Sequence, residues 1–312
     1  MEKLRILFMG TPDFAMCSLK CLFEAGENIV GVITGEDKAK GRGLKIAYSP
    51  VKEYANSKAL PVYQPATLKN DAIADLLALL QPDIITVVAY GKLLPEYVIN
   101  YPKYGCINVH GSLLPEYRGA APIQRAVIDG KTATGITTMF MDTSLDTGDI
   151  IFTKKTEIGE NETVGELWDR LAQMGGELLV KTVNAIKDGD FPRIKQDDSL
   201  ATYAPKIEKP ETHIDFSCDA KKVHDKIRGL SPFPSAICNI DGRPAKIYDT
   251  EYIKMQHGKK PGEIISLSCI GVTVACGRDC IKIRKIKPEG SKALSVGDLI
   301  NGRKLSFESI FS

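Results

Sequence analysis

Residues 4–13 read Leu4-Arg5-Ile6-Leu7-Phe8-Met9-Gly10-Thr11-Pro12-Asp13, a short apolar run that ends in a glycine and a turn. Apolar residues then recur with helical spacing as far as Gly26, and a second β-type run follows at 29–33. The order strand, turn, helix, strand is typical of a domain in which parallel strands alternate with helices. The fold class expected from this stretch is therefore α/β.

The same alternation continues outward along the chain. Helical patterns and β-type runs follow one another at 51–59, 72–80, 84–89, 106–110, 121–128, 135–141 and 163–187. Continuous β-branched runs separated by helices indicate parallel strands that are covered on both faces. We therefore expect residues 1–187 to form one doubly wound, Rossmann-like catalytic domain.

The composition changes after this domain. Residues 188–207 are rich in turn formers and charged residues, which indicates a linker. Residues 208–312 contain one helical pattern, at 220–230, and otherwise short β-type segments that are broken by glycines. Short strands of this kind predict a small antiparallel β-barrel or sandwich as a second domain.

Length and composition narrow the class of protein. With 312 residues, of which 43% are hydrophobic and 26% charged, the chain can bury a sizeable core. No stretch approaches the roughly 18 consecutive apolar residues of a membrane span, and the segment after Met1 lacks the apolar core of a signal peptide. The eight cysteines are scattered through apolar segments, which predicts reduced thiols in a cytoplasmic protein.

Two cysteine pairs, Cys17 with Cys21 and Cys276 with Cys280, have to be considered as metal ligands. The first pair lies in a helical pattern, and the second spans a predicted hairpin turn. Neither pair has a histidine or a further cysteine pair nearby in the sequence, as a zinc site would require. We therefore expect no bound metal.

The glycine at the end of the first strand invites comparison with dinucleotide-binding sites. Those sites use a second and a third glycine to let the pyrophosphate approach the backbone, and the segment from Gly10 to Ala15 lacks both. Asp13 would also place a carboxylate where a phosphate would lie. A nicotinamide enzyme is therefore disfavoured, and Asp13 is more typical of the first turn of a helix.

Two polar side chains lie in the later strand Cys106-Ile107-Asn108-Val109-His110. Because side chains alternate along a strand, Asn108 and His110 should share one face while Val109 packs on the other. Both should emerge at the carboxyl end of the strand, where open α/β sheets bind ligands. Taken alone, such a pair could equally be structural and hydrogen-bonded within the fold.

A second polar cluster lies in the turn-rich segment that joins the strand ending near Met141 to the next one. It contains three carboxylates, those of Asp142, Asp146 and Asp149. Asp142 and Asp149 fit the pattern of turn residues that bind their own backbone. Asp146 is better explained as the partner of His110.

Together these two segments resemble the signature of the 10-formyltetrahydrofolate-dependent formyltransferases, as Asn108-x-His110-x-Ser112-Leu113-Leu114-Pro115 and Asp142-x-x-x-Asp146-x-Gly148-x-Ile150. Further matching blocks lie in order along both expected domains, at 8–14, 40–43, 89–95, 117–124 and 228–234. The resemblance implies a Rossmann-like catalytic domain followed by an oligonucleotide-fold barrel, in agreement with the organisation predicted above. It also implies 10-formyltetrahydrofolate as co-substrate.

The resemblance further implies roles for individual residues. An amine attacks the formyl carbon through a tetrahedral oxyanion, to which Asn108 and a protonated His110 would donate. Asp146 would favour the imidazolium and help a water relay the proton of the amine. The pterin would be held by residues of three segments: Val88, Tyr90 and Leu94; Ser112, Leu113, Leu114 and Pro115; and Asp142.

Over its full length the chain is most similar to family members that formylate methionine on charged initiator tRNA, which implies a monomeric enzyme of translation initiation. A glycine-rich basic loop would approach the acceptor end of the tRNA, through Lys38, Lys40, Arg42 and Lys45. In 281–287 the alternation places Lys282 and Arg284 outside, where they can follow phosphates. Residues 208–312 carry 18 Lys and Arg against 13 Asp and Glu. A solvated loop and an ordinary charged barrel face remain open alternatives.

Two other functions stay open from the sequence. One is a formyltransferase for a sugar nucleotide or glycinamide ribotide, or a formyl-folate hydrolase, none of which needs the basic loop. The other is a nucleic-acid-binding or regulatory protein with a degenerate enzyme domain. The presence of Asn108, His110 and Asp146 together argues against the second.

Overall fold

The computed structural model describes residues 3–40 and 45–312. These residues form two compact units, each made of three chain segments. Unit 1 consists of Met1–Gly119, Gly135–Thr156 and Trp168–Tyr203, and unit 2 of Ala120–Thr134, Glu157–Leu167 and Ala204–Ser312. Two segments from the middle of the sequence therefore fold with the last third of the chain.

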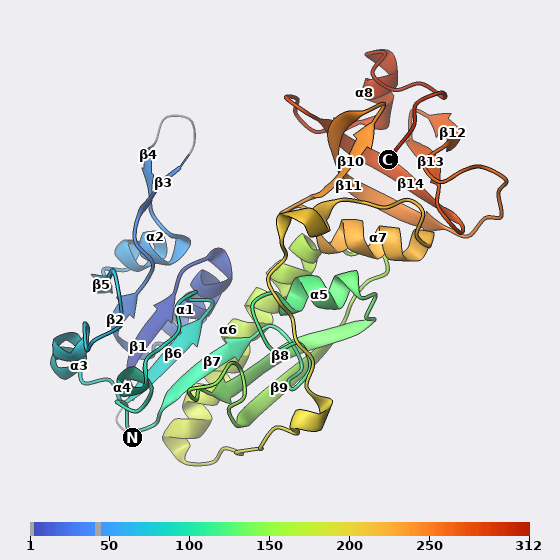
Figure 1. Ribbon diagram of the computed structural model, residues 1–312. Coiled ribbons are helices and arrows are strands. Elements are labelled where there is room, and N and C mark those ends of the chain that lie inside the picture. Colours follow the sequence, from blue (N-terminus) through green and yellow to red (C-terminus); the bar gives the residue numbers. More distant parts are fainter. Residues whose placement is uncertain (1–2, 41–44) are drawn as a thin grey trace. The chain divides into compact units, whose positions relative to one another are not determined.

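Unit 1 is built on a sheet with seven strands among the described residues, in the order β5-β2-β1-β6-β7-β8-β9 (Figure 1). Its strands are β1 (Arg5–Gly10), β2 (Asn28–Ile33), β5 (Val62–Tyr63), β6 (Ile84–Val88), β7 (Cys106–His110), β8 (Ala133–Phe140) and β9 (Ile150–Glu157). The neighbours from β5 to β7 pair in parallel, and β8 pairs antiparallel with β7. Because the strand order reverses between β1 and β6, the carboxyl ends of the central strands form the type of edge where α/β sheets bind ligands.

Helices cover both faces of this sheet (Figure 1). They are α1 (Asp13–Glu24), α2 (Pro50–Ser57), α3 (Ala74–Leu80), α4 (Glu96–Ile99) and α6 (Val164–Asp188), of which α6 belongs to unit 1 from Trp168 onward. A short hairpin of β3 (Lys38–Lys40) and β4 (Lys45–Ala47) precedes α2. Leu7 and Ile85 of the central strands pack in one cluster with residues of α3 and α4. On the other face, the hydroxyls of Thr138 and Thr182 lie 2.8 Å apart, which joins β8 to α6.

Local signals set where two of these helices begin. Ser49 accepts the N–H of Lys52 at 3.1 Å, and Pro50 occupies the first turn of α2. At the start of α6, Thr163 and Glu166 form a reciprocal cap in which the carboxylate accepts the backbone N–H of Thr163 at 2.9 Å. These hydrogen bonds lower the pKa of Glu166 below its ordinary value.

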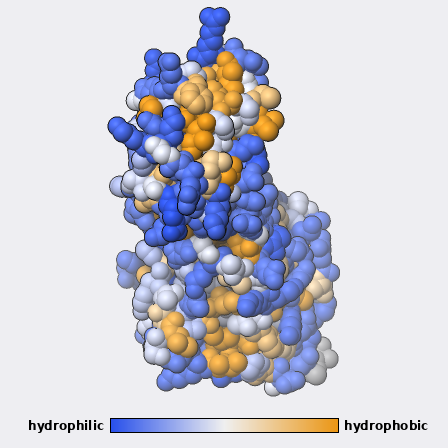
Figure 2. Space-filling model, turned by 90° about the vertical axis from the view of Figure 1, so that its right-hand side faces the viewer, coloured by the Kyte–Doolittle hydropathy of each residue, from blue (hydrophilic) through white to orange (hydrophobic). Residues whose placement is uncertain are grey.

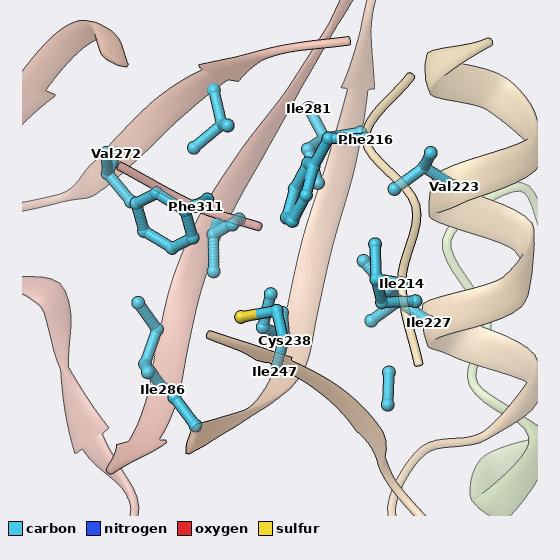
Figure 3. Close-up of a cluster of buried hydrophobic side chains, with 14 of the residues drawn as sticks. Ile214, Phe216, Val223, Ile227, Cys238, Ile247, Val272, Ile281, Ile286 and Phe311 are labelled. Carbon is cyan, nitrogen blue, oxygen red and sulfur yellow. The ribbon is translucent and has the colours of Figure 1, made fainter. Parts of the chain in front are cut away.

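Unit 2 contains an antiparallel sheet with the order β10-β11-β14-β13-β12, and β15 pairs with β14. Its strands are β10 (Ala236–Ile240), β11 (Arg243–Ile253), β12 (Ile264–Ser268), β13 (Gly271–Ala275), β14 (Cys280–Pro288) and β15 (Leu294–Ser295), and its helices are α5 (Pro122–Ile128), α7 (Ala220–Gly229) and α8 (Val296–Asn301). Figure 3 shows Val223 and Ile227 of α7 facing the apolar side chains of the strands. Phe216 and Phe311 meet edge to face within this core, with ring centroids 5.9 Å apart.

The segment Ile310–Ser312 connects the two edges of the sheet of unit 2. Its backbone exchanges hydrogen bonds with Asn239 and Asp241 of the β10 edge, and the N–H of Phe311 donates to the Gly262 carbonyl before β12, at 3.0 Å. The antiparallel sheet is thereby closed into a small barrel-like domain, since both edge strands are paired.

The fold class expected from the sequence is confirmed: a parallel-sheet α/β region is followed by a small antiparallel, barrel-like region. The expected helices and strands are found, with bounds that differ by one or two residues. One difference is the direction of β8, because the run at 135–141 was expected to continue a parallel sheet and instead pairs antiparallel with β7. The apolar pattern of a strand buried on both faces does not depend on its direction.

None of the helices within residues 3–40 and 45–312 combines the length and the hydropathy of a membrane-spanning segment. On the face shown in Figure 2, hydrophobic residues form separate patches among hydrophilic ones.

Candidate active site

The two polar residues of β7 lie where the sequence predicted them. Val109 faces α6, near Gly175, so Asn108 and His110 point to the opposite face of the sheet. The neighbouring parallel strand β6 pairs Val87 with Asn108. The loops that follow β6 and β7 therefore leave the sheet at the same edge.

His110 is buried, with 5% of its surface exposed, and has an oxygen acceptor near each ring nitrogen. Nε2 lies 2.9 Å from the carbonyl oxygen of Tyr117, and Nδ1 lies 3.6 Å from Oδ2 of Asp146. Both ring nitrogens of His110 therefore face oxygen atoms, which can only accept a hydrogen bond from an N–H of the ring.

Asp146 lies in the loop between β8 and β9 and has a positive φ of 55°. Its Oδ2 accepts the backbone N–H of Gly119 at 2.8 Å. This hydrogen bond directs the carboxylate toward His110, although the 3.6 Å separation from Nδ1 is longer than a hydrogen bond. Nδ1 of His110 is therefore not hydrogen-bonded to Asp146 and is left for a contact with a substrate atom or a water.

Asn108 is half-buried. Within residues 3–40 and 45–312, its side chain makes no hydrogen bond to another protein group. An amide at the sheet edge without a protein partner can donate to a ligand.

The turn after β7 is held firmly by hydrogen bonds. The buried Ser112 donates its hydroxyl to the Glu116 carbonyl at 2.6 Å, and its own carbonyl accepts the hydroxyl of Thr137 at 2.7 Å. The same hydroxyl oxygen of Thr137 accepts the N–H of Leu114 at 3.2 Å. The predicted folate residues Leu113 and Pro115 are half-buried beside this turn.

The predicted folate residues at the end of β6 and in the segment after it are all buried: Val88, Tyr90 and Leu94. Within the part of the chain that the structure describes, the hydroxyl of Tyr90 is buried without a hydrogen-bond partner. Burial raises the pKa of Tyr90 to about 12, with a smaller contribution from the negative charge of Glu36. A buried hydroxyl without a partner is a suitable contact for a polar group of a heterocyclic ligand.

Asp142 is exposed and accepts hydrogen bonds from within its own loop. Its carboxylate binds the N–H of Ser144 at 3.0 Å and the hydroxyl of Thr147 at 2.8 Å. This is the turn geometry that the sequence offered as the alternative to a folate contact.

The predicted tRNA-binding residues fall in two places. Arg42 lies outside the described residues, while Lys38, Lys40 and Lys45 belong by their backbone to the β3–β4 hairpin. Lys282 and Arg284 lie on β14 of unit 2, and both are half-buried.

The two β14 residues differ in their charge environment. Arg284 forms ion pairs with Glu251 and, at 3.4 Å, with Asp249. In the described part of the chain Lys282 forms no ion pair. The positive charge of Arg284 is therefore partly neutralised, and Lys282 is the better candidate for a phosphate contact.

Sequence reasoning missed the groups that hold the site together. Tyr117 and Gly119 act through backbone atoms, which no side-chain pattern reveals. Arg118 and Gln196 are almost completely buried and hydrogen-bond to each other, at 3.1 and 2.8 Å. The matching block at 117–124 was a sequence signal for Tyr117, Arg118 and Gly119. Gln196 had no such signal, because it lies in the stretch that was expected to be a linker.

No group of three or more His, Cys, Asp or Glu side chains that could hold a metal ion occurs in residues 3–40 and 45–312.

Comparison with known proteins places two family models on the chain. The model described as "Formyl transferase" matches residues 3–183, and "Formyl transferase, C-terminal domain" matches residues 206–304. The methionyl-tRNA formyltransferase of Clostridium novyi is 45% identical over 308 residues, covering 98% of this chain and 99% of that protein. That of Marinobacter nauticus is 45% identical over 301 residues, covering 96% and 97%.

A solved structure shares the fold at low sequence identity. HypX from Aquifex aeolicus, crystallised in complex with tetrahydrofolic acid, has a TM-score of 0.65 and 17% identity, over 96% of this chain and 47% of that one.

Proposed function

The chain belongs to the formyltransferase family, and on this premise we propose that it formylates initiator methionyl-tRNA with 10-formyltetrahydrofolate as the donor. The observation that carries the proposal is the 45% identity, over nearly the whole of both chains, to a curated methionyl-tRNA formyltransferase. The product, formylmethionyl-tRNA, supports translation initiation. The reaction transfers one carbon unit. The proposed mechanism uses protein groups that donate and accept hydrogen bonds or protons and that position the substrates.

The geometry of the site supports roles for its three polar residues. The α-amine attacks the formyl carbon, the bond from that carbon to N10 breaks, and the proton of the amine is passed to N10. The amide of Asn108 would donate to the oxyanion that forms in between. The imidazolium of His110 stabilises the same charge and can release the Nδ1 proton, and Asp146 stabilises the imidazolium.

The folate site belongs to the proposal as well. One wall for the pterin would be formed by the buried residues at the end of β6 and just after it, Val88, Tyr90 and Leu94. The Tyr90 hydroxyl would gain a partner there. The rigid turn formed by Ser112, Leu113, Leu114 and Pro115 would form another. Asp142 would contact the pterin through backbone groups of its loop, since its carboxylate is occupied.

For the tRNA we propose contacts from Arg42 and the lysines Lys38, Lys40 and Lys45, and from Lys282 and Arg284 on β14. An excess of positive charge in residues 208–312 supports this assignment, because phosphates dominate the affinity of such complexes.

We also propose a functional division into a catalytic domain (1–187), a linker (188–207) and a tRNA-binding barrel (208–312), in a monomer that acts in the cytoplasm. This division differs from the compact units, in which 120–134 and 157–167 fold with unit 2 and 188–203 with unit 1. All eight cysteines are free thiols, which is in keeping with a reducing compartment.

The deciding experiment measures formyl transfer from 10-formyltetrahydrofolate to three acceptors in parallel: charged initiator tRNA, charged elongator methionine tRNA and free methionine. We expect the initiator tRNA to give by far the highest kcat/KM. Equal transfer to free methionine, or transfer only to small amines, would contradict the proposal and favour a small-molecule formyltransferase.

A further inference from the structure

We propose that Gln196 is a positioning residue that fixes Asp146 against His110 for formyl transfer. The inference rests on the proposed function, because it concerns the same reaction. Gln196 is buried, with 7% of its surface exposed, and both ends of its amide are bound by protein groups. Any effect it has on the reaction must therefore pass through its protein neighbours.

Both ends of the Gln196 side chain are used. Its Nε2 group donates to the carbonyl oxygen of Asp146 at 2.9 Å and to that of Gly148 at 2.8 Å. Its Oε1 accepts from Nε of Arg118 at 3.1 Å and from Nη2 at 2.8 Å. One amide thus links the loop that carries Asp146 to the segment that follows β7.

Arg118 fixes the orientation of that amide. Its guanidinium is 2% exposed and has only donors, so it binds the oxygen end of the Gln196 amide and excludes the NH₂ end. The NH₂ group must then face the two loop carbonyls, which can only accept. The orientation of Gln196 is therefore dictated by chemistry on both sides.

Asp146 needs such support. Its φ of 55° is in the left-handed region, where a residue with a Cβ is held only if its surroundings fix it. The backbone N–H of Gly119, the residue after Arg118, donates to the carboxylate of Asp146. The side chain of Gln196 donates to the backbone carbonyl of Asp146. The residue before Arg118, Tyr117, accepts from His110. The segment 117–119 and Gln196 therefore set the relative position of the acid and the imidazole.

The test uses Gln196→Glu. A carboxylate keeps the contact with Arg118 but loses the NH₂ donor and turns an oxygen toward the carbonyls of Asp146 and Gly148, which repels them. We expect kcat for charged initiator tRNA to fall by about tenfold or more, with the KM of each substrate within about twofold of wild type. A raised KM at unchanged kcat would overturn the inference, because it would mean a role in substrate binding.

A matched control is Asp198→Ala. Asp198 binds the same guanidinium, with 2.7 Å between its Oδ1 and Nη2 of Arg118, but its side chain is 81% exposed. We expect kcat within about twofold of wild type. An equal loss of kcat in both variants would show that general support of Arg118 matters, and would overturn the assignment to Gln196.

A double-mutant cycle with Asp146→Asn separates positioning from simple loss of structure. If Gln196 acts through Asp146, then Gln196→Glu should lower kcat far less in the Asp146→Asn background than in the wild type. Independent, multiplicative losses would overturn the proposal. Thermal unfolding is followed in parallel, and Gln196→Met, which keeps the length of the side chain, replaces Gln196→Glu if that variant does not fold.

The outcomes also separate this inference from the proposed function. If the wild-type enzyme does not formylate charged initiator tRNA, the proposed function fails whatever Gln196 does. If Asp146→Asn alone keeps normal kcat, the role of Asp146 and the positioning role of Gln196 both fail. A loss on Asp146→Asn with normal kcat for Gln196→Glu overturns only the inference about Gln196.

Discussion

Replacing Asp146 by asparagine removes one negative charge beside His110 and preserves most of the local structure. Asparagine has nearly the same size, tolerates the positive φ of 55°, and keeps an oxygen that can accept the N–H of Gly119. The charge that is lost lies 3.6 Å from Nδ1 of His110, and both side chains are largely buried. The variant therefore tests the electrostatic part of the proposed mechanism.

The expected magnitude follows from that distance. Two unit charges 3.6 Å apart interact by about 4–5 kcal/mol at an effective dielectric constant of about 20, which is an upper limit for this pair. Part of that energy is present before the reaction, so we expect a loss of about 3 kcal/mol in the transition state. Each 1.36 kcal/mol is tenfold in rate, which gives a fall in kcat of about 10².

Single-turnover formyl transfer to charged initiator tRNA, with saturating 10-formyltetrahydrofolate, measures this step directly. A suitable control is Asp149→Asn in the same loop, because Asp149 pairs with the exposed Arg193 and not with His110. We expect the control within about twofold of wild type. If the rate of Asp146→Asn stayed within about threefold of wild type in a folded protein, the assigned role of the carboxylate would be wrong.

Three further predictions concern tRNA binding and stability. Replacing Lys282 and Arg284 by alanine should reduce the slope of log Kd for tRNA against log salt concentration by about one unit. A loss of one unit is expected because ion pairs already neutralise Arg284. An unchanged slope would exclude β14 from the tRNA interface. Phe311→Ala should destabilise unit 2 by about 3–5 kcal/mol in urea unfolding, since the ring is 1% exposed and packs on Phe216, and a loss below about 1 kcal/mol would contradict that packing. Burial lowers the pKa of His224 in the folded protein. As the pH falls below about 6.5, the unfolded chain therefore binds this proton before the folded protein does, and the stability should decrease. The variant His224→Gln should show a shallower decrease, and an equally steep one would refute His224 as the source of the pH dependence.

Much of unit 1 could be predicted because its sequence signals are local. The apolar run before Gly10 and the spacing of apolar residues in 163–187 gave a strand and a helix near their observed bounds. The antiparallel pairing of β8 could not be predicted, because burial on both faces gives the same pattern in either direction.

The candidate site shows the same division between local and non-local signals. Asn108 and His110 could be found because alternation along a strand places them on one face, and the structure brings His110 close to Asp146. Gln196 could not be found, because its polar neighbours in the sequence indicated a linker and its partners lie far away along the chain. The partner of a buried amide is set by tertiary structure, which composition does not contain.

The three-segment make-up of unit 2 has a consequence for biosynthesis. Helix α5 (Pro122–Ile128) belongs to unit 2, where Ile128 packs against the core to which α7 contributes. During translation α7, which begins at Ala220, is made about 90 residues after α5, and at about 5–20 residues per second this takes about 5–20 s. For that interval Ile128 lacks the core against which it packs in the folded protein, because the buried residues of that core lie at 214–311.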